Sequence, residues 1–266
     1  MPRLQDRVVI VTGGGHGIGR AYCRGAAAEG AWVVVADIDG AAANRVAGEV
    51  QKDGGEALPL AIDVSDEAQV QRMAKATIDR FGRIDGIINN AAVFISVPLV
   101  RVSSIEEMTV EEWDRVMAVN VRGVFLCCKA VVPYMKAQRY GKIVNIASTT
   151  ALQGLAAFGA YPVSKAAVLG ITRGLARDLG AFGITVNTIA PGGTQSRDDI
   201  DEEEVRQRRE GLEYQPGGRL SGVFIRAIRR LQTPRDLVGA AIFLLSPDSD
   251  FVSGQTVVVD GGSYMT

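Results

Sequence analysis

The strongest constraint on the fold is the regular alternation of short apolar runs with segments of helical pattern. The runs do not alternate with polar residues, so both faces of each strand should be covered, as in a parallel sheet. Parallel neighbours need helical crossovers, and we therefore expect a doubly wound α/β fold with helices on both faces of seven mainly parallel strands. The predicted strands are Val8–Val11, Trp32–Ala36, Leu58–Ile62, Ile84–Asn89, Ile143–Ala147, Ile184–Ile189 and Thr256–Asp260.

Signals for the beginning of a helix stand in two of the intervening segments. Thr109 and Glu112 have the spacing of a capping box. The helix that they begin should place Asn120 on its apolar face. Thr233 is expected to cap a later helix that runs towards Leu245.

Composition favours a globular protein that binds a small molecule. The 266 residues are 47% hydrophobic and 22% charged, so we expect a single domain over residues 1–266. The formal net charge of -1 gives no field that would attract nucleic acid or an anionic membrane. No secretory leader and no run of about 18–20 apolar residues is recognisable, so we expect a cytoplasmic location.

No metal site is expected. His16 is the only histidine, and the three cysteines Cys23, Cys127 and Cys128 lack the spacing of metal ligands. The cysteines are instead interpreted as small buried side chains in a reducing compartment.

A glycine-rich turn, Thr12–Gly19, follows the first predicted strand and leads directly into a helix. Glycine permits a tight turn and a close approach of the backbone to phosphate, and the N-terminus of a helix favours an anion. The pattern therefore predicts a binding site for the pyrophosphate of a dinucleotide. The residues expected to form it are Gly13, Gly15, His16, Gly17, Ile18 and Gly19.

Asp37 closes the second predicted strand, with Ile38 beside it at the same expected site. A carboxylate in this position accepts hydrogen bonds from the adenosine ribose hydroxyls of NAD and repels the 2′-phosphate of NADP. NAD is therefore the expected cofactor, and NADP is the less favoured one.

The order and spacing of these motifs resemble the short-chain dehydrogenase/reductase family over residues 7–262. The glycine motif of that family is similar to Thr12–Gly19. The resemblance implies a Rossmann-like fold and further cofactor-binding residues. Those residues are Asp63 and Val64 as an adenine-contacting pair, Asn90 and Ala91 from an Asn-Asn-Ala motif, and Pro191, Gly192 and Thr194 from a loop that positions the nicotinamide carboxamide.

The family's catalytic set is similar to Asn120, Ser148, Tyr161 and Lys165. The resemblance implies that Tyr161 removes the alcohol proton and that Ser148 hydrogen-bonds the substrate oxygen. It also implies that Lys165 holds the nicotinamide ribose and that Asn120 keeps a water in a proton relay. On a helix over Tyr161–Leu179, Lys165 shares a face with Tyr161, and its charge should lower the pKa of Tyr161 from about 10 towards working pH.

Together these patterns predict an NAD-dependent oxidoreductase that interconverts a secondary alcohol and a ketone. An NADPH-dependent reductase of a ketone or 3-oxoacyl thioester remains an alternative, which Asp37 disfavours. A non-catalytic NAD-binding sensor is a second alternative, but a sensor has no need of Tyr161 and Lys165. The resemblance implies a homo-oligomer, either a tetramer or a dimer.

The substrate pocket is expected to be mostly apolar, which favours a hydrophobic or mixed secondary alcohol. Its predicted lining is Val93, Phe94, Thr149–Phe158 and an insertion at about residues 194–232. Within that insertion, the charged stretch Asp198–Glu210 is interpreted as a solvated helix and loop.

Overall fold

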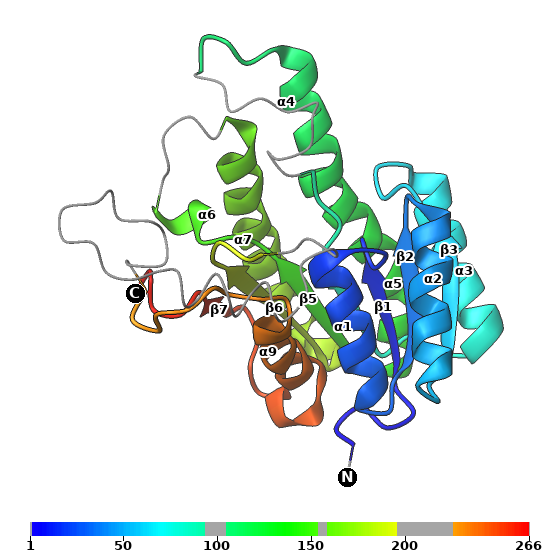
Figure 1. Ribbon diagram of the computed structural model, residues 1–266. Coiled ribbons are helices and arrows are strands. Elements are labelled where there is room, and N and C mark those ends of the chain that lie inside the picture. The colour runs from blue at the N-terminus through cyan, green and yellow to red at the C-terminus, as the bar shows by residue number, and fades with distance from the viewer. Residues whose placement is uncertain (1, 94–104, 154–158, 196–225, 266) are drawn as a thin grey trace.

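The computed structural model describes residues 2–93, 105–153, 159–195 and 226–265. A sheet of seven parallel strands lies at its centre, in the order β3-β2-β1-β4-β5-β6-β7 (Figure 1). The predicted class of fold is therefore confirmed. The strands are β1 (Val8–Thr12), β2 (Trp32–Asp37), β3 (Ala57–Ala61), β4 (Gly86–Asn89), β5 (Gly141–Ile146), β6 (Ile184–Pro191) and β7 (Thr256–Val259).

Every predicted strand is present, and its ends lie within two residues of the expected ones. The inner strands are almost completely buried, as their continuous apolar runs predict. The edge strands β3 and β7 are partly exposed, because each has a neighbour on one side only.

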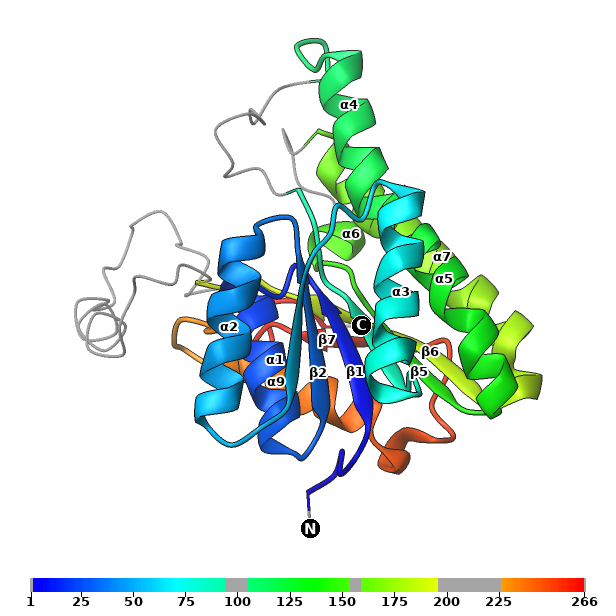
Figure 2. The same ribbon diagram turned by 90° about the vertical axis from the view of Figure 1, so that its right-hand side faces the viewer.

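Helices cover both faces of the sheet, and each face has its own core (Figure 2). Successive residues of β1 show the division, because Ile10 packs in one core while Val9 and Val11 pack in the other. One face is covered by α1 (Gly17–Ala28), α2 (Gly40–Lys52) and α9 (Arg235–Leu245), and the other by α3 (Glu67–Phe81), α5 (Gly123–Gln138) and α7 (Ala160–Leu179). The short helices are α6 (Thr150–Gln153), η2 (Gly180–Phe182) and η3 (Pro247–Ser249).

Helix α4 (Val110–Met117) continues through a π-helical turn, η1 (Ala118–Arg122), into α5. The predicted capping box is confirmed at its start: Thr109 Oγ1 accepts from the Glu112 amide at 3.1 Å, and Glu112 Oε2 accepts from the Thr109 amide at 3.1 Å. Asn120 lies inside the π turn and is buried, as its position on the apolar face predicts. Turns of this kind often mark functional sites.

The helical run Val110–Gln138 is long and apolar enough to cross a membrane by length and composition alone, which the sequence reasoning had not expected. Half of its most apolar window is buried inside the protein, where α5 packs against α3 and β5. We interpret it as a core helix.

The predicted cap of α9 is wrong. Pro234 occupies the N-cap position without a side-chain hydrogen bond, and Thr233 lies one residue earlier. Thr233 is instead the donor: its amide donates to the Asp236 carboxylate at 2.8 Å. Asp236 also forms a salt bridge with Arg230.

The strand order reverses between β1 and β4, so the connections after these two strands leave in opposite directions. In open α/β sheets, ligands bind at the carboxyl ends of the strands where such a reversal occurs. This edge carries the residues that follow β1, β2, β4, β5 and β6, and it is where the candidate site lies.

Candidate active site

At Gly13 and Gly19, the glycine turn after β1 has no room for a side chain next to the surrounding backbone. Gly13 has a φ of +62°, and a Cβ on it would lie 2.8 Å from the Ala91 Cα. A Cβ on Gly19 would lie 1.9 Å from the carbonyl oxygen of Gly13. The turn delivers the chain into α1 at Gly17, where the first amide groups of the helix face the carboxyl edge and suit an anion.

Hydrogen bonds fasten this turn to the end of β4. Thr12 Oγ1 accepts from the amides of Asn90 and Ala91 at 3.0 and 3.1 Å. Asn90 Nδ2 donates to the carbonyls of Thr12 and Gly13 at 3.0 and 3.1 Å. The structure thus brings together two predicted segments. Sequence reasoning missed the part played by Thr12, for which the signal was a hydroxyl residue directly before the glycines.

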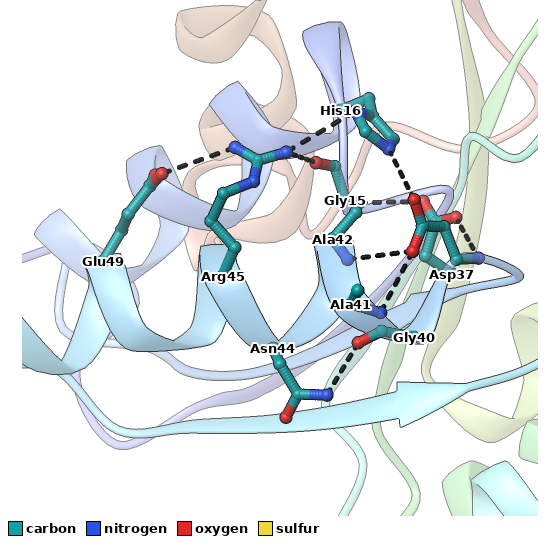
Figure 3. A network of polar contacts seen from close by, with 10 residues as sticks. Gly15, His16, Asp37, Gly40, Ala41, Ala42, Asn44, Arg45 and Glu49 are labelled. Carbon is teal, nitrogen blue, oxygen red and sulfur yellow. Dashed lines mark hydrogen bonds and ion pairs between the residues drawn. The ribbon is translucent and has the colours of Figure 1, made fainter.

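Asp37 lies against the glycine turn (Figure 3). Its Oδ2 accepts from the Gly15 amide at 2.8 Å, and its Oδ1 accepts from the Asp39 amide at 2.9 Å. The residue is 8% exposed, whereas the neighbouring Ile38 side chain is 73% exposed. The carboxylate is therefore held in a fixed position at the end of β2, next to the backbone expected to bind the pyrophosphate.

Arg45 on α2 reaches back to the same turn (Figure 3). Its Nη2 donates to the Gly15 carbonyl at 2.8 Å and lies 3.5 Å from His16 Nδ1. His16 Nε2 lies 3.4 Å from Asp39 Oδ2. Sequence reasoning missed Arg45, because nothing in its helical segment distinguishes it from other surface arginines.

Asp63 and Val64 follow β3, the neighbour of β2. Asp63 Oδ1 accepts from the Ser65 amide and hydroxyl at 2.8 and 2.7 Å, and Val64 is buried. Both residues therefore lie at the same edge of the sheet as Asp37, where the resemblance requires an adenine contact.

Tyr161 and Lys165 lie on one buried face of α7, as their spacing predicts. Lys165 Nζ is 5.7 Å from the centroid of the Tyr161 ring, and it donates to the Ile146 carbonyl at 2.8 Å. The helix α7 therefore presents a phenol and an ammonium group side by side at the end of β5.

Burial raises the pKa of Tyr161 to about 12, and a hydrogen bond with the Ser148 side chain opposes this shift. Burial also lowers the pKa of Lys165 to about 8. The expected lowering of the Tyr161 pKa is therefore wrong for this structure, because loss of solvent around the phenolate outweighs the opposing hydrogen bond. The Lys165 value, in contrast, lies near working pH, where proton transfer is most efficient.

Ser148 stands just beyond β5 and is 8% exposed. Its Oγ accepts from the Thr150 amide at 3.2 Å at the start of α6. The amide of Thr149, the residue that follows Ser148, donates to the Pro191 carbonyl at 3.0 Å. This bond connects the segment to the end of β6. The hydrogen bond between the Ser148 and Tyr161 side chains therefore joins the end of β5 to α7.

The Asn120 side chain joins three segments around the predicted catalytic residues. Its Oδ1 accepts from the Val93 amide at 2.8 Å, and its Nδ2 donates to the Val93 carbonyl at 3.1 Å and to Ser164 Oγ at 3.0 Å. Ser164 in turn donates to the Tyr161 carbonyl at 2.7 Å. Sequence reasoning missed Ser164, although its place three residues after Tyr161 puts it on the same side of α7.

The loop after β6 is held by neighbouring segments. The Gly192 amide donates to the Val259 carbonyl at 3.0 Å, and Thr194 pairs with Gln232 in an isolated bridge. Thr194 Oγ1 also donates to the Gly192 carbonyl at 3.0 Å, and the Arg226 side chain donates to the Gly193 carbonyl. The backbone of this loop is therefore fixed at the edge of the site.

Part of the expected substrate pocket lies outside the described residues. This holds for Phe94, for residues 154–158 and for residues 196–225, which include the charged stretch Asp198–Glu210. In the described part of the chain, no three His, Cys, Asp or Glu side chains lie close enough together to hold a metal ion.

The fold and the site together define a dinucleotide-binding enzyme. Comparison with known proteins leads to the same class. The family model described as enoyl-(acyl carrier protein) reductase matches residues 13–264. Sorbitol dehydrogenase from Cereibacter sphaeroides is 38% identical over 267 residues, and galactitol 2-dehydrogenase from Agrobacterium fabrum is 39% identical over 266 residues. Each match covers 99% of this chain and 100% of the relative. The crystal structure of levodione reductase aligns with a TM-score of 0.84 and 33% identity, over 97% of this chain and 98% of that one.

This chain belongs to the short-chain dehydrogenase/reductase family. It is an oxidoreductase that acts on CH–OH groups, and membership of the family implies a nicotinamide cofactor. The tight glycine turn, in which a Cβ on Gly13 or Gly19 would meet backbone atoms of the protein, fits such a dinucleotide.

Proposed function

We propose that the protein is an NAD-dependent oxidoreductase that interconverts a secondary alcohol and a ketone. The observation that carries this proposal is the placement of Tyr161 and Lys165 on one buried face of α7 beside Ser148. Asp37, fixed at the end of β2, favours NAD. The named activities of the relatives, sorbitol dehydrogenase, galactitol 2-dehydrogenase and levodione reductase, support the chemical class.

Residues of the carboxyl edge would hold the cofactor. The glycine turn and the start of α1 suit the pyrophosphate, and Asp37 suits the adenosine ribose. Lys165 would hold the nicotinamide ribose, and the loop Pro191–Thr194 would position the carboxamide. When bound, the nicotinamide donates or accepts the hydride.

The side chains around Tyr161 would move the proton. Tyr161 Oη takes the proton from the substrate hydroxyl during oxidation and returns it during reduction. Ser148 Oγ hydrogen-bonds the substrate oxygen and also stabilises the phenolate. Lys165 adds a positive charge close to Tyr161, and Asn120 would keep a water in the relay that carries the proton to solvent.

The proposal is tested by titrating the purified protein with NADH and with NADPH and following fluorescence. Tight, selective binding of NADH supports it, and secondary alcohols are then screened with NAD. Absence of binding by either dinucleotide contradicts it.

An NADPH-dependent reductase of a ketone or 3-oxoacyl thioester is the second candidate. The Arg45 guanidinium lies at the Gly15 carbonyl, next to the Gly15 amide that binds Asp37, and a cationic group in this position suits a 2′-phosphate. Preferential binding of NADPH in the same titration would favour this candidate and overturn the role given to Asp37. A non-catalytic sensor accounts less well for the buried pair Tyr161 and Lys165.

Asp37→Ala should weaken NADH binding by about 10–100-fold, because hydrogen bonds to a charged acceptor contribute about 1.5–3 kcal/mol. NADPH binding should weaken less, so the preference for NADH narrows. Paired dissociation constants check this result. Asp79→Ala removes an exposed carboxylate of α3 that pairs with Lys75, and it should leave both constants unchanged. An unchanged ratio in Asp37→Ala would show that this carboxylate does not select the cofactor.

We also propose that the protein is a homo-oligomer. The outer face of α4, η1 and α5 forms an open groove with an apolar floor and charges of both signs, so the same surface of a second copy can complement it. Phe125, in the groove, is 53% exposed. The lining residues are Asp114, Arg115, Met117, Ala118, Val121, Arg122 and Phe125.

Phe125→Asp should convert the oligomer into a smaller species, because it places a charge in the apolar lining of the groove. Size-exclusion chromatography with light scattering measures the change. Lys75→Asp, an exposed substitution on α3, should leave the mass unchanged. If Phe125→Asp and wild type have the same mass, the interface between subunits does not lie at this groove.

A cytoplasmic location is part of the proposal. The cysteines Cys23, Cys127 and Cys128 are free and buried, which suits a reducing compartment. Cell fractionation with an antibody against the protein tests the location.

A further inference from the structure

A row of buried polar side chains crosses strands β4, β5 and β6 near the candidate active site. Asn89 lies opposite Asn145 in the pairing of β4 with β5, and Asn145 lies opposite Thr188 in the pairing of β5 with β6. Thr172 reaches this row from α7, and all four residues are at most 3% exposed. Polar groups in such a position are costly unless each finds a partner.

Hydrogen bonds join these side chains in sequence. Asn89 Nδ2 donates to Asn145 Oδ1 at 2.8 Å, and Asn145 Nδ2 donates to Thr172 Oγ1 at 2.9 Å. The hydroxyl oxygens of Thr172 and Thr188 lie 2.7 Å apart. Since Thr172 accepts from Asn145, its own proton is available to Thr188, and the bonds can strengthen one another in the low-dielectric core.

The same helix carries Tyr161, Lys165 and Thr172 on its buried face. Lys165 Nζ binds the Ile146 carbonyl, and Thr172 binds the side chain of the preceding β5 residue, Asn145. Helix α7 is therefore fastened to β5 at two levels. The tie through Thr172 uses no residue of the catalytic set, so it persists whichever partner the Lys165 ammonium takes.

We propose that Thr172 is a positioning residue, which sets the spacing between α7 and the sheet and thereby the place of Tyr161 and Lys165. The proposal rests on the function proposed above. A hydroxyl pair at 2.7 Å is closer than a carbon and an oxygen can approach, which is about 3.3–3.6 Å. Thr172→Val should therefore push α7 away from β6, and a misplacement of about 1 Å can cost about 100-fold in rate.

The test compares Thr172→Val with Thr172→Ser in steady-state kinetics and NADH titration. The valine variant should lower kcat by about 10–100-fold and leave KM and the NADH dissociation constant within about twofold. The serine variant keeps the hydroxyl and should restore most of kcat. If the role of Thr172 were purely structural, both variants would have a lower melting temperature, and kcat would not differ between them in this way.

Thr77→Val is the matched control. Thr77 is a buried threonine on α3, and its hydroxyl donates to the Met73 carbonyl of its own helix at 2.8 Å. The substitution also removes a buried hydroxyl. Because this hydroxyl bonds within its own helix and does not connect the helix to the sheet, kcat should not change.

Crystal structures of the wild type and of Thr172→Val give a readout that needs no activity. Displacement of α7, with a changed distance from Lys165 Nζ to the Ile146 carbonyl, supports the proposal. An unmoved helix overturns it, and so does a valine variant with the kcat of wild type or a serine variant as slow as the valine one. A displaced helix in a protein inactive on every secondary alcohol would contradict the proposed function alone.

Discussion

Tyr161→Phe should reduce turnover by about 100–10,000-fold, the range that a positioned acid–base group contributes. The substitution removes only the hydroxyl that is proposed to exchange a proton with the substrate. The aromatic ring stays in its place on α7, beside the Lys165 ammonium. NADH binding should therefore remain within about twofold of the wild-type value, because the proposed cofactor contacts are retained.

The measurement is the rate of NADH formation from a secondary alcohol, together with NADH titration of each variant. Tyr22→Phe is the matched control, because Tyr22 is 1% exposed on α1 and its hydroxyl has no hydrogen-bond partner in the described part of the chain. Its kcat should not fall. Wild-type turnover in Tyr161→Phe would remove this residue from the chemistry.

Gly19→Ala should abolish detectable dinucleotide binding and lower stability by about 1–3 kcal/mol, the usual range for overpacking. The added Cβ would lie 1.9 Å from the Gly13 carbonyl oxygen and 2.8 Å from Asn90 Nδ2. No change of rotamer relieves a clash with the backbone. The glycine turn must open, and the amides that are expected to face the pyrophosphate move with it.

Thermal unfolding and NADH titration check this prediction. Gly48→Ala is the control, since a Cβ on this residue of α2 meets nothing within 4 Å. That variant should bind NADH normally and gain about 0.5–1 kcal/mol, the usual difference between alanine and glycine in a helix. Normal NADH binding by Gly19→Ala would show that the turn is not the pyrophosphate site.

The sequence predicts those parts of the fold that depend on local pattern. The continuous apolar runs locate every strand within two residues, and the glycine turn and Asp37 come together at the edge that the strand order defines. The spacing of Tyr161 and Lys165 predicts their shared face, because helical geometry alone decides it.

The remaining features depend on contacts between distant segments, which no local pattern specifies. Arg45 reaches the Gly15 carbonyl only because α2 packs beside the glycine turn. Asn120 meets Ser164 across two elements, within a π turn that has no simple sequence signal. The Tyr161 pKa was predicted from one neighbour, Lys165, whereas desolvation by the whole surrounding core determines its direction.

The hydrogen bond from the Gly15 amide to Asp37 has a consequence for protein engineering. The residue expected to choose between NAD and NADP also supports the turn expected to bind the part that both dinucleotides share. Exchanging this carboxylate for a small neutral side chain would therefore weaken affinity in general while it alters preference. A successful redesign towards NADP would need a replacement acceptor for the Gly15 amide as well as a cation for the additional phosphate, so the two changes would have to be selected as a pair.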